Sequence, residues 1–192
     1  LARALLSRGG RVLITGRRTD HVASAVQRLA THGEVSGVAA NVTNPQGRDL
    51  TLGRMHESFG GLDILVNNAG GVRAGRLEAI SEHEIRAMIE VNLTAPILLT
   101  QAALPSLRKA QQGLIINVSS GIALIPLPFY TAYAATKAGI ASFGDSLRRE
   151  LAGEGIDVLT VYPTATDTPM MKTSGMNPPG GAPGQWALGN VA

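Results

Sequence analysis

The sequence contains no cysteine, which excludes disulfides, thiolate catalysis and cysteine-ligated metals and is compatible with a reducing cytoplasm. Aromatic residues make up 4% of the 192 residues and charged residues only 16%. The net charge of +3 is small and its basic residues are dispersed, so nucleic acid is not indicated as a partner. No apolar run reaches the roughly 18 residues of a membrane-spanning helix, and no signal-peptide pattern is visible. We therefore expect a cytoplasmic protein with neither nucleic-acid nor membrane partners.

Hydrophobic residues, in contrast, are plentiful at 44%, and there are 23 glycines. A chain of this length and composition is long enough to bury one core, so residues 1–192 are predicted to form a single domain. Many glycines with few aromatics are typical of α/β proteins, which need tight turns between strands and helices. The composition therefore favours an α/β domain over a disordered chain.

Apolar runs bounded by glycine or proline alternate with segments of helical period. Strands are predicted at residues 11–15, 35–40, 62–66, 114–118 and 157–162, and helices at 20–31, 44–59, 81–110 and 129–153. Such alternation implies right-handed βαβ units and a Rossmann-like, doubly wound parallel sheet with helices on both faces. Residues 164–192, rich in proline, glycine, threonine and methionine, are predicted to be a mobile substrate lid.

The most informative polar residues follow predicted strand ends. Arg17, Asn67 and Ser120 each lie at the end of a strand, and so do residues 164–168. In a doubly wound sheet ligands bind beyond the carboxyl ends of the strands. These residues are therefore expected to converge on one edge of the sheet.

Tyr133 and Lys137 are four residues apart on a predicted helix, so their side chains share one face. A phenol with a pKa of about 10 exchanges protons poorly near neutral pH. A nearby cation would lower the pKa of Tyr133 and make it a usable acid or base. Such a pair also arises by chance on many helices. Ser120, thirteen residues earlier at a strand end, adds a hydroxyl that could bind the reacting oxygen.

Five segments together resemble one family, the short-chain dehydrogenases/reductases of the short, single-domain branch. The segments occur in the family's order and spacing and span nearly the whole chain: Asn-Asn-Ala-Gly (67–70), Val-Asn-Leu-Thr (91–94), Ile-Asn-Val-Ser-Ser (116–120), Tyr-Ala-Ala-Thr-Lys (133–137) and Pro-Thr-Ala-Thr-Asp-Thr (163–168).

The resemblance implies four catalytic residues. Tyr133 would be the general acid/base, and Lys137 would hold the nicotinamide ribose and depress the pKa of Tyr133. Ser120 would orient the substrate oxygen, and Asn92 would kink its helix and support a proton-relaying water. The reaction implied is hydride transfer between a nicotinamide cofactor and a carbonyl/alcohol substrate.

The resemblance also implies a set of cofactor contacts. Asn68, Ala69 and Gly70 would pack against the adenosine side of the cofactor, and Thr168 would bind the nicotinamide carboxamide. The remaining cofactor-binding residues, besides Tyr133 and Lys137, would be Val42, Pro163 and Thr166. No metal ligand is predicted, because the four histidines are scattered over predicted surface helices.

The choice of cofactor depends on the end of the first predicted strand. An acidic residue at this position binds the ribose of NAD, whereas an arginine accommodates the 2′-phosphate of NADP. Here Gly16 removes the carboxylate and Arg17 offers a cationic fork suited to phosphate. The sequence therefore favours NADP over NAD. Arg18 is either a second phosphate ligand or a solvated charge at a helix start, and Asn41 replaces the family's usual aspartate near adenine.

Two family features are not found in the sequence. The Gly-rich fingerprint Thr-Gly-x-x-x-Gly-x-Gly and its strand are absent, and so is the family's final strand. The chain is therefore expected to be truncated at both ends and to bind NADP poorly alone. Without that first strand, its neighbours in the sheet would lose a pairing partner.

Several interpretations stay open. The apolar residues 123–129 indicate either a partly apolar substrate or core packing beneath the next helix. Rival functions are a catalytically silent dinucleotide-binding or regulatory module, and a sugar epimerase or dehydratase on the same scaffold. The family resemblance further implies a homodimer or homotetramer assembled through the helices predicted at residues 81–110 and 129–153.

Overall fold

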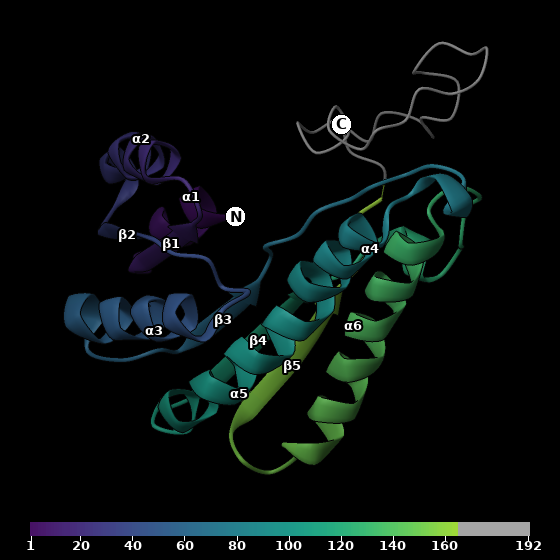
Figure 1. The fold of residues 1–192 in the computed structure, drawn as a ribbon. Helices are drawn as coiled ribbons and strands as arrows, with labels where there is room; N and C mark the ends of the chain where they lie inside the picture. The colour runs from purple at the N-terminus through teal and green to yellow at the C-terminus, as the bar shows by residue number, and fades with distance from the viewer. Residues whose placement is uncertain (165–192) are drawn as a thin grey trace.

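A computed structural model describes residues 1–164 of the chain, and every predicted strand and helix is present in it (Figure 1). The strands are β1 (Val12–Gly16), β2 (Val35–Ala39), β3 (Ile64–Asn67), β4 (Gly113–Val118) and β5 (Ile156–Val161). The α-helices are α1 (Ala2–Leu6), α2 (Thr19–Leu29), α3 (Pro45–Phe59), α4 (Glu82–Ile89), α5 (Ala95–Leu107) and α6 (Thr131–Glu150). The predicted lid lies outside the described residues, apart from Thr164.

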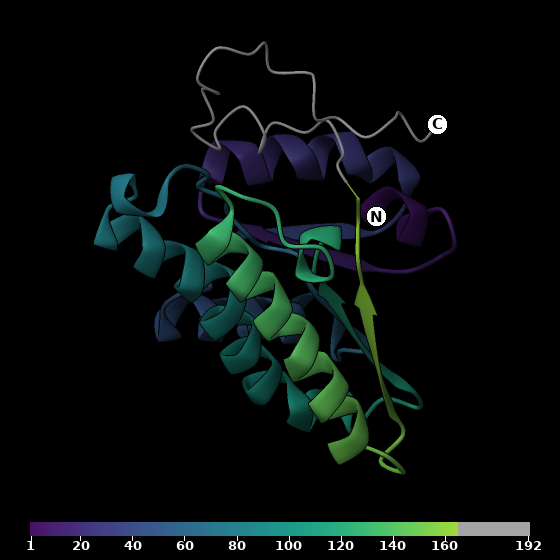
Figure 2. The same cartoon turned by 90° about the vertical axis from the view of Figure 1, so that its right-hand side faces the viewer.

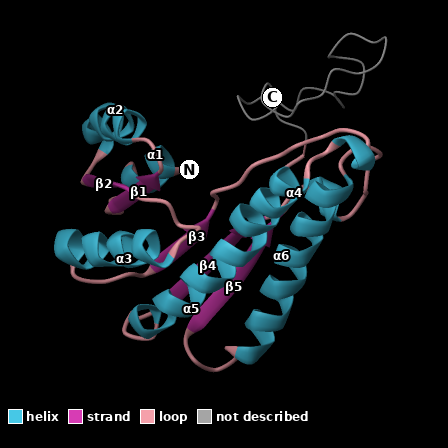
Figure 3. Cartoon of the chain, viewed as in Figure 1, coloured by secondary structure: helices cyan, strands magenta, loops and turns pink. Residues whose placement is uncertain are grey.

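Short helical turns complete the described chain. A π-helix, Glu90–Thr94, joins α4 to α5, so the single helix predicted at residues 81–110 is continuous but irregular at its centre. Three 3-10 turns follow α2, precede α4 and follow β4: Ala30–His32, Leu77–Ala79 and Gly121–Ala123. Figure 3 shows how regularly strands and helices alternate.

The five strands pair in parallel, as predicted, but they form two sheets. One sheet has the order β1-β2 and the other the order β3-β4-β5. The single continuous sheet predicted from the alternation is therefore divided between β1 and β3. Among residues 1–164, β1 pairs with β2 alone and β3 with β4 alone, so no strand bridges the two sheets. The predicted loss of a pairing partner in the middle of the sheet agrees with this gap between β1 and β3.

Helices cover both faces of the smaller sheet and one face of the larger one. Helix α2 packs on β1 and β2 from one side, and α3 lies on the other side (Figure 1). Helix α5 packs on β3 and β4, α6 packs on β4 and β5, and α4 lies beside α6 (Figures 1 and 2). The predicted arrangement of helices on both faces is present in the smaller sheet, and α4, α5 and α6 form the single layer on the larger sheet on which the site is built.

The core lies between this helix layer and the larger sheet. Ala95, Leu99, Ala103 and Leu107 recur every four residues and therefore form one buried stripe along α5. They pack with alternate residues of the strands, which point to the same face: Leu65, Ile115, Ile156 and Val158. Burial of this apolar surface holds β3, β4 and β5 in register beneath the helices.

The helix starts agree with local sequence signals. Ser81 caps α4 by accepting from the Glu84 N–H, and the Glu84 carboxylate accepts from the Ser81 N–H. The two residues therefore form a capping box, in which each satisfies a backbone N–H of the other at the helix start. At the start of α3, Asn44 accepts from the Gly47 N–H and Pro45 occupies the first helical position, which suits a residue without an N–H.

The helical run from residue 82 to residue 107 is long and apolar enough to cross a membrane by length and composition alone. Its most apolar stretch has a mean hydropathy of 1.3, and it is the one such run in the described part of the chain. Its buried stripe, however, packs against β3 and β4 inside the domain. Its role as the central helix of the fold therefore accounts for its apolar character.

Candidate active site

The carboxyl ends of β3, β4 and β5 meet at one edge of the larger sheet. The register aligns Asn67 with Asn117 and Val118 with Val161. Beyond the strands, the Ser119 N–H donates to the Val161 carbonyl at 2.9 Å and the Gly121 N–H donates to the Pro163 carbonyl at 2.9 Å. The predicted convergence of strand ends is therefore present for these three strands, with Ser120 and Pro163 on adjacent segments.

Helix α6 brings Tyr133 and Lys137 to the same edge. The Lys137 ammonium donates to the Val118 carbonyl at 2.8 Å, and its Nζ lies 5.8 Å from the centroid of the Tyr133 ring. The Lys137 side chain is buried, with 6% of its surface exposed, whereas Tyr133 is half-buried. The end of β4 and the first turns of α6 thus hold the two side chains together, as their spacing predicted.

The pKa of Tyr133 differs in direction from the prediction. Burial raises it above its ordinary value of 10, and the interaction with the Ser120 hydroxyl lowers it again only in part. Lys137 is not among the causes of this shift, so the expected depression of the Tyr133 pKa by Lys137 stays a prediction. The interaction between Tyr133 and Ser120 shows that the two hydroxyls are neighbours.

Lys137 also has a shifted pKa. Burial lowers it from 10.5 to about 8, because the charged ammonium loses contact with water. Near neutral pH the side chain therefore remains mostly protonated, but close to its midpoint. An ammonium poised in this way can both attract an anion and take part in proton exchange.

Asn92 lies in the π-helix between α4 and α5 and is 2% exposed. Its Oδ1 accepts from the Gly71 N–H at 2.8 Å, and its Nδ2 donates to the Gly71 carbonyl at 2.8 Å. The predicted irregularity of the helix at Asn92 is therefore a π-turn, a feature often found at functional sites. The side chain clamps the loop that follows β3.

The segment Asn68, Ala69 and Gly70 forms the start of that loop. Asn68 and Ala69 are exposed at the edge where the strands end. A Cβ added to Gly70 would stand 2.9 Å from Asn92 Oδ1 and 3.8 Å from Lys137 Nζ. Glycine therefore allows the backbone to lie directly against these two catalytic candidates.

The residues predicted to contact the 2′-phosphate and adenine follow β1 and β2, whose carboxyl ends are aligned with each other at Gly16 and Ala39. Arg17 is exposed, and Arg18 is held by Asp20 through two hydrogen bonds of 2.7 and 3.3 Å. This pairing favours the interpretation of Arg18 as a charge at a helix start, while Arg17 remains available to an anion.

Asn41 and Val42 follow β2 and have other partners. Asn41 Oδ1 accepts from both the backbone N–H and the hydroxyl of Thr43, at 3.3 and 3.0 Å. The Val42 side chain belongs to the hydrophobic core, and its carbonyl accepts from Arg48 at 3.0 Å. A cofactor contact at Val42 would therefore involve its backbone N–H. Thr166 and Thr168 lie outside the described residues.

Two further polar residues, which were not predicted as site residues, support the site. Ser119, at the end of β4, donates from its hydroxyl to the Lys137 carbonyl at 2.7 Å. Thr136, on α6, is 2% exposed, accepts from Asn92 Nδ2 at 3.1 Å and donates to the Tyr133 carbonyl at 2.7 Å. The only sign of their role in the sequence is that they adjoin Ser120 and Lys137. Their residue type alone does not mark them, because hydroxyl residues are common on strands and helices.

Asn67 is buried, and its side chain is bound inside the fold by two other side chains. Its Nδ2 donates to Asn117 Oδ1 at 2.9 Å and to the Thr100 hydroxyl at 3.0 Å. Asn67 Oδ1 and Asn117 Nδ2 are buried without a hydrogen-bond partner among the described residues. This amide pair joins the ends of β3 and β4 beneath the loops that carry Asn68 and Ser120.

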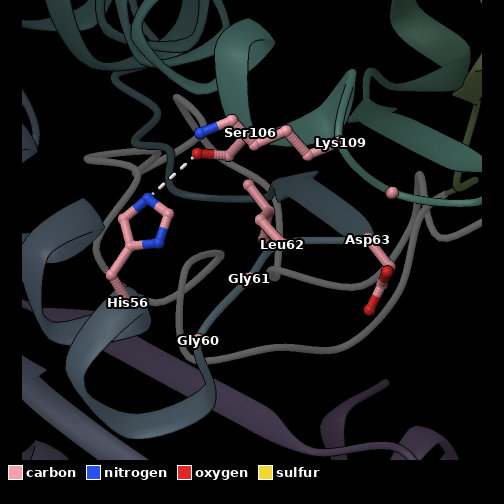
Figure 4. Close-up of a pocket in the computed structure, with 8 residues that line it drawn as sticks. His56, Gly60, Gly61, Leu62, Asp63, Ser106 and Lys109 are labelled. Atoms are coloured by element: carbon pink, nitrogen blue, oxygen red, sulfur yellow. Dashed lines mark hydrogen bonds between the residues drawn. The ribbon is translucent and has the colours of Figure 1, made fainter.

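Two hollows lie outside this constellation. One, of about 250 Å³, lies at the opposite edge, where α3 and α5 end and β3 begins, and the His56 ring hydrogen-bonds to the Ser106 hydroxyl there at 3.0 Å (Figure 4). The other, of about 490 Å³, is apolar and lies between Pro126, Leu127 and Pro128 and the first turns of α6. Only the second adjoins the segment that links Ser120 to Tyr133.

Comparison with known proteins agrees with this geometry. The family model described as short chain dehydrogenase matches residues 1–178. A 3-oxoacyl-(acyl-carrier-protein) reductase from Vibrio cholerae is 38% identical over 172 residues, spanning 90% of this chain and 70% of the relative.

Solved structures show the same fold. An alcohol dehydrogenase from the archaeon Thermococcus sibiricus, complexed with 5-hydroxy-NADP, has a TM-score of 0.80 at 28% identity, covering 87% of this chain and 71% of that one. A 3-ketoacyl-(acyl-carrier-protein) reductase from Brucella melitensis, complexed with NADH, has a TM-score of 0.82 at 28% identity, covering 90% and 73%. The chain belongs to the short-chain dehydrogenase/reductase family. It is an oxidoreductase of the class that acts on CH–OH and keto groups.

Proposed function

We propose that this oxidoreductase uses NADP(H) and interconverts a carbonyl and an alcohol, with Tyr133 as the general acid/base. The observation that carries the proposal is the convergence of Ser120, Tyr133 and Lys137 at the carboxyl edge of β4, where Lys137 Nζ lies 5.8 Å from the Tyr133 ring. The three residue types suit proton transfer to an oxygen atom beside a cation.

The residues along the edge fit a dinucleotide. Asn68 and Ala69 are exposed, and there is no room beside Asn92 for a Cβ at position 70. With glycine at that position, the backbone of this segment is open to close approach by a cofactor. Exposed Arg17 offers a cation at the end of β1. When bound, NADPH would supply the hydride to the carbonyl carbon and leave as NADP.

The protein would supply the proton and the orientation. Tyr133, with its pKa raised by burial, stays protonated near neutral pH and is therefore ready to donate to the carbonyl oxygen as the alcohol forms. The Ser120 hydroxyl would donate a hydrogen bond to the same oxygen. Afterwards the Lys137 ammonium would stabilise the Tyr133 phenolate, and solvent would return its proton.

For the cofactor, we propose NADP over NAD. Arg17 is exposed after β1, where a 2′-phosphate would lie, and Gly16 provides no competing carboxylate. The two solved relatives named above were complexed with 5-hydroxy-NADP and with NADH respectively. The ratio of kcat/KM with NADPH to that with NADH measures the preference, and a ratio below one would contradict it.

For the substrate, we propose a partly apolar carbonyl compound. Leu124, Ile125 and Leu127 are 65%, 72% and 51% exposed, so these side chains do not pack in the core beneath α6. They lie on the segment between Ser120 and Tyr133, beside the apolar hollow. The name of the Vibrio cholerae relative describes a reductase of a 3-oxoacyl group, which is a carbonyl of this kind.

The remaining proposals concern the cellular location and the oligomeric state of the enzyme. We propose that it works in the cytoplasm as a homodimer or homotetramer, with α4, α5 and α6 at the interface, in agreement with the family resemblance. Light scattering of the purified protein measures its mass, and a monomer at micromolar concentration would contradict the assembly.

The decisive experiment measures NADPH oxidation with a panel of apolar and polar carbonyl compounds. NADPH is supplied at the highest practical concentration, because the Gly-rich loop is not in the sequence. Tyr133→Phe is expected to lose at least about 100-fold in kcat, since the phenol proton is removed. Tyr130→Phe is the matched control: its ring lies 6.3 Å from that of Tyr133, and its activity should stay within a few-fold.

The outcomes separate the rival functions. Activity that survives in Tyr133→Phe would contradict the role of Tyr133. A protein that binds NADPH but turns over no carbonyl would instead favour the catalytically silent binding module.

A further inference from the structure

A short chain of buried hydrogen bonds connects the loop after β3 to the turn of α6 that carries Tyr133. The chain runs from Gly71 through Asn92 to Thr136 and ends at the Tyr133 carbonyl. Asn92 and Thr136 are each 2% exposed, so water does not compete strongly for these bonds. The two ends of the chain are the proposed cofactor loop and the proposed acid/base.

At the loop end, Asn92 binds both polar groups of one residue. Its Oδ1 accepts from the Gly71 N–H and its Nδ2 donates to the Gly71 carbonyl, both at 2.8 Å. A Cβ at the preceding Gly70 would stand 2.9 Å from Oδ1, so the loop is packed as well as bonded against Asn92. The position of this loop is therefore determined by the Asn92 side chain.

At the helix end, the Thr136 hydroxyl makes two bonds with opposite roles. It accepts from Asn92 Nδ2 at 3.1 Å and donates to the Tyr133 carbonyl at 2.7 Å. A threonine on a helix often donates to a carbonyl three or four residues earlier, so the second bond alone carries no functional meaning. The bond to Asn92 crosses from α6 to the π-helix and gives Thr136 a partner that itself holds the cofactor loop.

We propose that Thr136 is a positioning residue that fixes Tyr133 relative to the loop of residues 68–71. The inference rests on the proposed function, because it assigns Tyr133 as the acid/base and the loop as a cofactor contact. Hydride and proton must reach neighbouring atoms of one substrate, so the distance between these two segments matters to the rate. Misplacement by about 1 Å at such a site costs up to about 100-fold in rate.

Thr136→Val and Thr136→Ser test the role. Valine keeps the volume and branching but removes both bonds, whereas serine keeps the hydroxyl and loses a methyl group. We expect kcat to fall about tenfold in Thr136→Val with little change in the KM for NADPH, and to stay within about twofold in Thr136→Ser. A merely structural role would instead lower thermal stability and leave kcat at low temperature unchanged.

Thr100→Val is the matched control for losing a buried threonine hydroxyl. Thr100 is 1% exposed on α5 and accepts from Asn67, outside the chain that leads to Tyr133. Its kcat should equal that of the unsubstituted protein, even if its stability falls. Equal losses of kcat in Thr136→Val and Thr100→Val would overturn the proposed role of Thr136.

Hydrogen exchange at the Gly71 amide provides a readout that needs no turnover. Loss of the Thr136 bond should loosen Asn92 and speed exchange at Gly71 about fivefold in Thr136→Val, but not in Thr136→Ser or Thr100→Val. Unchanged exchange at Gly71 together with unchanged kcat would overturn the inference while Tyr133→Phe still tests the function. If the unsubstituted protein shows no turnover, the proposed function fails, and unchanged exchange then overturns the link as well.

Discussion

Replacing Lys137 with methionine should stabilise the folded protein near neutral pH. Lys137 is 6% exposed, and burial lowers its pKa from 10.5 to about 8. Methionine has a similar length but no charge, so it fills the same space without the cost of burying an ammonium. Activity should be lost at the same time, because Lys137 is proposed to hold the cofactor and stabilise the Tyr133 phenolate.

The magnitude follows from the lowered pKa of Lys137. Each pKa unit corresponds to about 1.36 kcal/mol, so keeping Lys137 charged in the folded state costs about 3 kcal/mol near pH 7. Methionine also loses the bond from Lys137 Nζ to the Val118 carbonyl, which offsets about 1 kcal/mol of the gain. The free energy of unfolding should therefore rise by about 2 kcal/mol.

The effect should disappear as the pH rises. Between about pH 8 and 10.5 the unfolded chain holds the Lys137 proton while the folded chain releases it. The unfolded state then binds more protons, so the stability of the unsubstituted protein increases with pH in this window. This gain in stability is lost again as the pH falls from 10.5 to about 8. Near about pH 9.5 the remaining cost is about 1 kcal/mol, and the two proteins should be equally stable.

Equilibrium unfolding in urea at pH 7 and at about pH 9.5 measures both differences. The measurement stays below pH 10 so that ionisation of Tyr133 does not contribute. Because the pKa of Tyr133 is raised in the folded state, this residue stabilises the fold below pH 10, and the stabilisation is lost as the phenol ionises at higher pH. Lys109→Met is the control: Lys109 is exposed, and its replacement should change stability by less than about 0.5 kcal/mol. A Lys137→Met protein less stable than the original at pH 7, or a difference independent of pH, would refute the reasoning.

Two further predictions concern backbone packing and cofactor choice. A Cβ at Gly47 would stand 1.9 Å from the Asn41 carbonyl oxygen, whereas one at Gly53 on the same helix meets nothing within 4 Å. In urea unfolding, Gly47→Ala should therefore destabilise the fold by more than about 2 kcal/mol. Gly53→Ala should stabilise it by about 0.5–1 kcal/mol. Similar effects of the two substitutions would contradict the packing argument. Arg17→Ala should raise the KM for NADPH about tenfold or more and leave that for NADH unchanged, because only NADPH has the 2′-phosphate. Arg18→Ala should have a smaller effect, since Asp20 already holds Arg18, and an equal rise for both cofactors in Arg17→Ala would contradict the phosphate contact.

Local features of the sequence were sufficient for the secondary structure and for the outline of the site. Apolar runs and helical spacing predicted β1 to β5 and the long helices, because both patterns depend on neighbouring residues. The capping box of Ser81 and Glu84 is likewise a local signal. The strand-end residues Asn67 and Ser120 were predicted to meet at one edge, because parallel strands align their carboxyl ends.

Other properties depend on which elements cover a residue. The pKa of Tyr133 is raised because its side chain is partly removed from water, and a spacing of four residues does not reveal burial. The apolar residues at 124, 125 and 127 could have been core or surface until their exposure was known. The division into two sheets also follows from hydrogen bonding between strands far apart in the sequence.

The sequence alone thus determined the elements and the residues available for chemistry, since both are properties of short segments. Only the tertiary structure decided how those residues act on one another. Lys137 donates to Val118, and Thr136 joins Asn92 to Tyr133, because the fold brings β4, the π-helix and α6 together. Contacts of this kind exist only once the chain has packed, because their partners lie 19 and 44 residues apart in the sequence.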